Sequence, residues 1–119
     1  MKILVVDDEN IVLDSCRKVL VSEGYDVCLV PSADKAIAAM EDDDFNLLLV
    51  DIMMPEHDGL YLMEEIKKRW PNKPVIVMSG YDTADTIKKA ADQGSDGFIN
   101  KPFTPDELIN MIQKVLGGE

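Results

Sequence analysis

The feature of this sequence that most constrains its fold is a regular alternation of short apolar runs with longer segments of helical periodicity. The runs contain no polar residue and are rich in branched side chains, which is typical of strands covered on both faces. They occupy residues 3–6, 27–30, 47–50, 75–78 and 98–99. Strands of this kind separated by helices predict an α/β protein with a parallel sheet.

Each segment between the runs carries apolar residues at helical spacing. The predicted stripes are Val12, Cys16, Val19 and Leu20; Ala33, Ala36, Ile37 and Met40; Leu60, Met63 and Ile66; Ala84, Ile87 and Ala91; and Leu108, Met111, Ile112 and Val115. The fourth stripe is the weakest because it consists mainly of alanine. Five strands and five helices fit the 119 residues as a single domain over residues 1–119.

Residues that favour helix ends lie where this division requires them. Ser32 and either Thr104 or Asp106 are expected to cap helix N-termini, and Gly24 and Gly94 are expected to terminate helices. The last residues, 117–119, are either a natural terminus or the start of a linker.

The charge balance argues against two classes of partner. The 23 acidic and 12 basic residues give a formal net charge of −11. This charge disfavours nucleic acids and anionic membranes, and no apolar run is long enough to span a bilayer. We therefore expect a cytoplasmic protein. Cys16 and Cys28 are expected to be reduced thiols, with a disulfide as the less favoured alternative.

Acidic residues also form a continuous run at positions 41–44. Neighbouring carboxylates at the end of a helix point in different directions, whereas a metal site needs them to converge. We interpret this run as a solvated turn without a metal.

Polar residues follow the apolar runs, at the edge where ligands bind in open parallel sheets. They are Asp7 and Asp8, Asp51, Ser79 and Gly80, and Asn100 and Lys101. Asp51 is the most informative, because it lies between apolar residues where an uncompensated carboxylate is costly.

Three converging carboxylates require a counter-charge. At 4 to 5 Å they repel one another by roughly 3 to 4 kcal/mol per pair at an effective dielectric of 20. Oxygen ligands at strand ends favour Mg²⁺ over Zn²⁺, and the single histidine, His57, has no companion ligand. Beside such an ion Lys101, with the Ser79 hydroxyl and the Gly80 amide, would receive a small dianion such as a phosphoryl group.

Four motifs in order carry a family resemblance. The acidic pair at 7–8, DIMMPEHDGL at 51–60, MSG at 78–80 and KPF at 101–103 resemble the receiver domain of two-component response regulators over the whole chain. This resemblance implies a flavodoxin-like, doubly wound sheet of five parallel strands in the order 2-1-3-4-5, with five helices.

The resemblance also implies roles for individual residues. Asp51 would accept a phosphoryl group from a phosphohistidine of a sensor histidine kinase or phosphotransfer protein. Mg²⁺ would be held directly by Asp8 and Asp51, by Asp7 mainly through water, and by the backbone carbonyl of Met53. Lys101 would pair with a phosphoryl oxygen and precede a cis peptide bond to Pro102. Such a domain catalyses only its own phosphotransfer and dephosphorylation.

Ser79 and Phe98 resemble the switch pair of the family, although a lone Phe in a strand is equally often a core residue. In the family the hydroxyl moves onto the phosphoryl group and the ring turns inward. Output, and any homodimer, would then involve the fourth helix, fifth strand and fifth helix.

Some positions depart from the commonest family pattern. Ser79 replaces a frequent Thr and Phe98 a frequent Tyr, while His57 is expected to be an exposed side chain. Met53 and Tyr81 are bulky and give no help in orienting water, so we expect a long-lived aspartyl phosphate.

Three other functions are each disfavoured by particular residues of the sequence. A phosphatase of the haloacid dehalogenase type would need an aspartate where Met53 stands. Flavin binding would need a phosphate loop where Asp7 and Asp8 stand. A receiver-like module that works without phosphorylation is the serious alternative, but it predicts loss of site residues that are all present.

Overall fold

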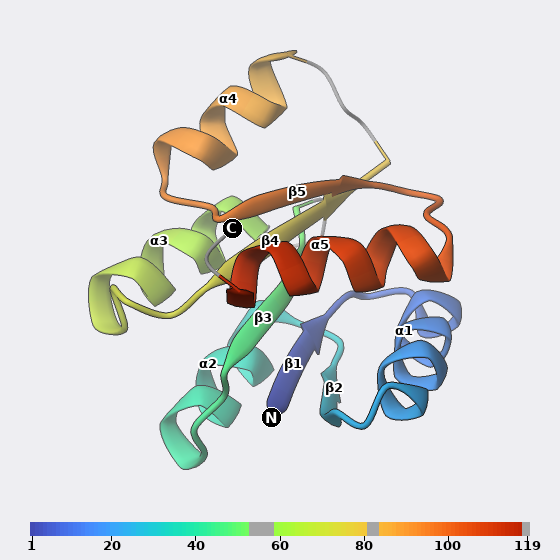
Figure 1. Ribbon diagram of the computed structural model, residues 1–119. Helices are drawn as coiled ribbons and strands as arrows, with labels where there is room; N and C mark the ends of the chain where they lie inside the picture. The colour runs from blue at the N-terminus through green and yellow to red at the C-terminus, as the bar shows by residue number, and fades with distance from the viewer. Residues whose placement is uncertain (53–58, 81–83, 118–119) are drawn as a thin grey trace.

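The computed structural model describes residues 1–52, 59–80 and 84–117, and within them five parallel strands form one sheet in the order β2-β1-β3-β4-β5 (Figure 1). The strands are β1 (Lys2–Val6), β2 (Asp26–Val30), β3 (Leu47–Asp51), β4 (Val75–Ser79) and β5 (Gly97–Asn100). The helices are α1 (Asn10–Ser22), α2 (Ala33–Asp42), α3 (Gly59–Arg69), α4 (Ala84–Asp92) and α5 (Pro105–Gly117). The predicted parallel α/β fold and strand order are confirmed.

Both faces of the sheet are covered, which explains why the strands read as continuous apolar runs. In β1, Leu4 and Val6 pack with buried residues of α2 and α3, whereas Ile3 and Val5 pack with buried residues of α1 and α5. Figure 1 shows α1 and α5 on one side of the sheet and α2 and α3 on the other. Since successive strand residues point to opposite faces, both faces of a central strand need apolar side chains up to the polar residue at its carboxyl end.

Two of the predicted caps are present at helix N-termini. Ser32 Oγ accepts a hydrogen bond from the backbone N–H of Lys35 at 3.2 Å. At α5, Thr104 Oγ1 accepts from the N–H of Glu107 while Glu107 Oε1 accepts from the N–H of Thr104, which forms a reciprocal capping box. Thr104, rather than Asp106, is therefore the cap of α5.

The predicted helix terminators have the backbone conformation that favours glycine. Gly24 follows α1 with φ of +88° and Gly94 follows α4 with φ of +93°. Each donates its N–H back to the preceding helix, to Val21 and Ala91 respectively. A side chain at either position would be strained.

The predicted stripe on α4 is wrong. Ala84 and Ala91 are exposed and Ile87 is 39% exposed, whereas Ala90 is fully buried. Alanine contributes too little apolar area to determine which face of a short helix is buried, so the sequence pattern could not orient α4.

Neither cysteine forms a disulfide. Cys16 is buried on α1 and Cys28 is half-buried on β2. Burial raises the pKa of the Cys16 thiol to about 11, with a smaller contribution from the negative charge of Asp7. Across the part of the chain that the structure describes, we find no helix with the length and apolar character to cross a membrane.

The acidic run at 41–44 lies near the amino ends of the strands, and three of its carboxylates each pair with a separate cation. We call these contacts the amino-end ion pairs. They are Glu41 with Arg69 at 2.6 Å, Asp43 with Lys2 at 2.5 Å, and Asp44 with Lys73 at 2.8 Å. All three carboxylate side chains are at least half exposed, as expected for a solvated turn, but their fixed cations were not predicted.

Candidate functional site

The polar residues that follow the strands meet at the carboxyl edge of the sheet. β1 and β3 are neighbours, with Val6 paired to Val50, so Asp7 and Asp51 emerge side by side. Lys101 reaches this edge because β5 ends at the preceding residue, Asn100. The backbone N–H of Lys101 donates to the carbonyl of Ser79 at 2.8 Å. The topology thus brings together side chains that are distant in the sequence.

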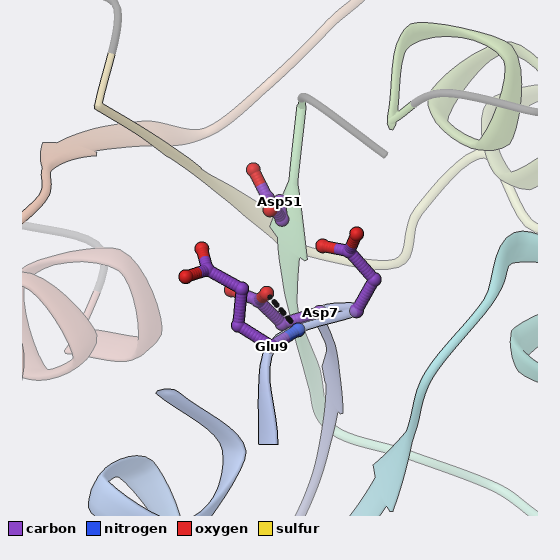
Figure 2. Close-up of side chains that lie close together, drawn as sticks. Asp7, Glu9 and Asp51 are labelled. Carbon is purple, nitrogen blue, oxygen red and sulfur yellow. Dashed lines mark hydrogen bonds between the residues drawn. The ribbon is translucent and has the colours of Figure 1, made fainter. Parts of the chain in front are cut away.

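Four carboxylates converge at this edge. Asp7, Asp8, Glu9 and Asp51 each offer an oxygen, and these oxygens all lie within 4.8 Å of one another. We call this group the carboxylate cluster. Figure 2 shows Asp7 and Glu9 at the end of β1 facing Asp51 at the end of β3. Asp7 is fully buried and Asp51 is 3% exposed, whereas Asp8 and Glu9 face solvent.

Lys101 supplies positive charge to the cluster. Its Nζ lies 2.6 Å from Asp7 Oδ2, 3.2 Å from Asp51 Oδ2 and 3.4 Å from Glu9 Oε1. The lysine side chain is 14% exposed, so these contacts are only partly screened by water. The peptide bond from Lys101 to Pro102 is cis, as predicted.

The pKa values of Asp7 and Lys101 are both raised, as expected for a site with excess negative charge. Burial raises the pKa of Asp7 to about 6, although Lys101 and the backbone N–H of Glu9 oppose the shift. Burial alone would lower the pKa of Lys101, but its hydrogen bond to Asp7 and the charges of Asp51 and Asp7 raise that pKa. One ammonium group therefore faces more negative charge than it can neutralise.

The residues present fit a hard divalent cation such as Mg²⁺. All four groups of the cluster are carboxylates, which are preferred by this ion. Apart from its ion pair with Lys101, the buried oxygen Asp7 Oδ2 accepts no hydrogen bond from the described residues. A buried carboxylate oxygen whose one partner is an ammonium group still has a lone pair for a metal ion or a bound water.

The cluster opens into a cavity of about 560 Å³. Asp8, Asp51, Gly80 and Lys101 line it, together with apolar side chains from α1 and the start of the β5–α5 loop. Ser79 is fully buried at the end of β4, and Phe98 is half-buried and packs against the core on the α2 and α3 side of the sheet. The structure thus brings the predicted acidic residues, Gly80 and Lys101 to one site.

Sequence reasoning missed Glu9 as a member of this group. The available signal was its position, directly after the acidic pair and at the start of a helix, where the chain must turn at the sheet edge. Three predicted positions, Met53, His57 and Tyr81, lie outside the described residues.

Known proteins resemble this chain in both fold and sequence. The profile of the response regulator receiver domain matches residues 3–113. The chain is 32% identical to response regulator MprA of Mycobacterium avium over 98% of its own length. Its TM-score is 0.94 to a CheY-like receiver domain protein of Methanospirillum hungatei, at 34% identity and covering 98% of this chain and 94% of the other. For the receiver domain of NtrX from Brucella abortus the TM-score is 0.93, at 38% identity and covering 98% and 99%.

The curated relatives are longer than this chain, which spans 51% of MprA and 24% of an NtrX-like response regulator of Rickettsia bellii.

Proposed function

Because this chain belongs to the family of response regulator receiver domains, we propose that it is a phosphorylation-dependent switch whose phosphoacceptor is Asp51. The donor is a phosphohistidine on a sensor histidine kinase or a phosphotransfer protein. The observation that carries this proposal is a nearly buried carboxylate, Asp51, 3.2 Å from the ammonium group of Lys101 and open to a cavity.

The chemistry asked of the protein is mainly positioning and charge neutralisation. An oxygen of Asp51 attacks phosphorus, and its new bond forms as the bond from phosphorus to the imidazole nitrogen breaks. The electron pair of that bond returns to the imidazole, which takes up a proton. Lys101 is close enough to Asp51 to pair with an oxygen of the transferred group. Gly80 lines the same cavity and would offer its backbone N–H.

Asp7, Asp8 and Asp51 would hold Mg²⁺ in this proposal. When bound, the ion would neutralise the negative charge of the carboxylates and of the incoming phosphoryl group. The carbonyl of Met53 is a further expected ligand from the family resemblance. Because the cluster repels a dianion, we expect phosphoryl uptake to require the metal.

The proposed switch pair is Ser79 at the end of β4 and Phe98 on the neighbouring strand β5. Lys101 N–H donates to the carbonyl of Ser79, so the residue that would pair with the phosphoryl group is tied to the end of β4. Phe98, two residues before Asn100, would turn inward when the Ser79 hydroxyl moves. The output surface would be α4, β5 and α5, which could bind an effector or a second copy of the chain. A ligand shifts such a switch only by its differential affinity for the two packings.

Intact mass spectrometry after incubation with phosphoramidate tests this proposal. We expect one added phosphoryl group in the wild type with Mg²⁺, and none with EDTA. Asp51→Asn should add none under either condition, whereas the matched control Asp43→Asn should behave as the wild type. Uptake by Asp51→Asn, or uptake that is independent of Mg²⁺, would contradict the proposal.

A further inference from the structure

Glu9 occupies the N-cap of α1 without serving as a cap. Ser, Thr, Asp and Asn are preferred at this position because their short side chains accept a hydrogen bond from the first turn. Glu9 makes no side-chain cap hydrogen bond. Its backbone takes part in the local turn: the N–H donates to Asp7 Oδ1 at 2.9 Å (Figure 2), and the carbonyl accepts from the N–H of Leu13 at 3.1 Å. The identity of this side chain is therefore not explained by the helix.

The side chain of Glu9 instead reaches the carboxylate cluster. Its Oε1 lies 3.4 Å from Lys101 Nζ, and its carboxylate belongs to the group of oxygens within 4.8 Å of one another. Glu9 is 63% exposed in its side chain, in contrast to Asp7 and Asp51. It can therefore move without opening the core.

A second observation indicates that this edge binds a cation. Asp7 is fully buried, and its Oδ2 has no hydrogen-bond donor apart from the ion pair with Lys101. Lys101 already faces Asp7 and Asp51 at shorter distances than it faces Glu9. The Glu9 carboxylate thus adds negative charge to a site where Lys101, the one cation among the described residues there, is already engaged.

We propose that Glu9 is a fourth carboxylate of the divalent cation site, which pairs with Lys101 while no cation is bound and adds its charge to the site when one binds. This inference rests on the proposed function only in taking the cluster as a cation site. In this proposal Glu9 contributes to cation affinity in addition to the acidic pair and the phosphoacceptor.

The proposal predicts a measurable loss of affinity when the charge is removed. Removing one water-exposed carboxylate charge from a divalent cation site should change the affinity of that site roughly three- to tenfold. Glu9→Gln removes the charge while keeping the side-chain length and the backbone N–H that binds Asp7. Titration with Mg²⁺ alone, followed by amide NMR shifts of Gly80 and Ile99, should show the Kd of this variant raised by that factor.

Two further variants separate charge from other effects. Asp14→Asn removes a charge from α1 at an exposed position paired with Lys18, so its Kd should stay within about twofold of the wild type. Glu9→Asp keeps the charge and should also stay within about twofold. A structural role for Glu9 would instead lower the thermal midpoint of Glu9→Gln in EDTA and leave the Mg²⁺ affinity unchanged.

Equal Kd values for wild type and Glu9→Gln would overturn the inference, as would a wild type that binds no Mg²⁺. Neither readout involves phosphoryl transfer. If the wild type binds Mg²⁺ more tightly than Glu9→Gln but takes up no phosphoryl group, the inference stands and the proposed function fails. If phosphoryl uptake is normal and the two Kd values agree, the proposed function stands and the role of Glu9 is excluded.

Discussion

Two groups of acidic residues lie at opposite ends of the same sheet and have opposite physical characters. At the carboxyl end, the carboxylate cluster brings four oxygens within 4.8 Å of one another around Lys101. At the amino end, three carboxylates of the acidic run 41–44 pair with three separate cations. The run has more consecutive acidic residues than the cluster, so acidity along the sequence does not identify a site.

The difference comes from the local backbone and from burial. Adjacent parallel strands deliver their next residues to one place, whereas a helix end followed by a turn spreads neighbouring side chains apart. Burial then raises the pKa of Asp7 to about 6, while the hydrogen bond from Lys2 lowers the pKa of Asp43. Convergence and burial together, rather than charge, distinguish a binding site from a solvated turn.

The largest expected effect on the free energy of unfolding comes from removing the Lys101 ammonium group from the carboxylate cluster. Lys101→Met leaves the buried carboxylate of Asp7 without its ion pair, which should cost about 3 kcal/mol of unfolding free energy at pH 7 without divalent ions. Lys2→Met, which breaks an exposed pair at the other end, should cost much less. Urea unfolding in EDTA measures both, and equal losses would remove the distinction between the two groups.

Removing a buried carboxylate from the cluster should stabilise the metal-free protein, whereas removing Lys101 destabilises it. Because the folded pKa of Asp7 is raised from 3.8 to about 6, the folded state binds more protons in this range and stability falls as pH rises from about 4 to 6. Asp7→Asn should remove that fall and stabilise the metal-free protein by about 3 kcal/mol at pH 7. Urea unfolding from pH 4 to 7 tests this, and an unchanged pH dependence in Asp7→Asn would contradict it.

Mg²⁺ should act on one end of the sheet only. At ten times its Kd the ion should stabilise the wild type by about 1.4 kcal/mol, which is about 6 °C in the thermal midpoint for a domain of this size. Asp8→Asn should lose most of this shift and Asp44→Asn should retain it. Thermal scans with and without EDTA provide the comparison, and a shift lost equally in both variants would refute it.

The smallest effect is expected at the amino-end ion pairs. Asp43→Asn should lower the thermal midpoint at pH 7 by no more than about 2 °C, because the pair with Lys2 is exposed. The lowered pKa of Asp43 means that its contribution is present above pH 3.8 and is lost as pH falls through the folded value, opposite in direction to Asp7. If Asp43→Asn lowers the thermal midpoint by the same amount in 1 M salt, the ion pair with Lys2 is not screened by salt and the prediction is contradicted.

The sequence predicts the sheet well because its strands are covered on both faces. The apolar runs lie within the observed strands, and the added residues are polar or glycine at strand ends, such as Lys2, Asp26 and Gly97. The order of the strands came from the family resemblance, since periodicity does not specify which strands are neighbours. The face of α4 was predicted wrongly because its stripe is mostly alanine.

The site was predicted in part for a related reason. Strand ends identify Asp7, Asp8, Asp51 and Lys101, because topology forces these positions together. Glu9 was missed because it lies at the N-cap of α1, and the sequence does not show whether an N-cap side chain contacts the helix or the sheet edge. The pairing of Lys101 with Asp7 depends on tertiary distances that no local pattern contains.

The most direct measurement is the location of the phosphoryl group. After incubation with phosphoramidate and Mg²⁺, borohydride reduction converts an aspartyl phosphate to homoserine, which peptide mass spectrometry can place in the sequence. Homoserine at position 51, and at no residue of 41–44, is the result predicted by a converging, buried site. Homoserine within 41–44, or spread over several exposed acidic residues, would contradict it.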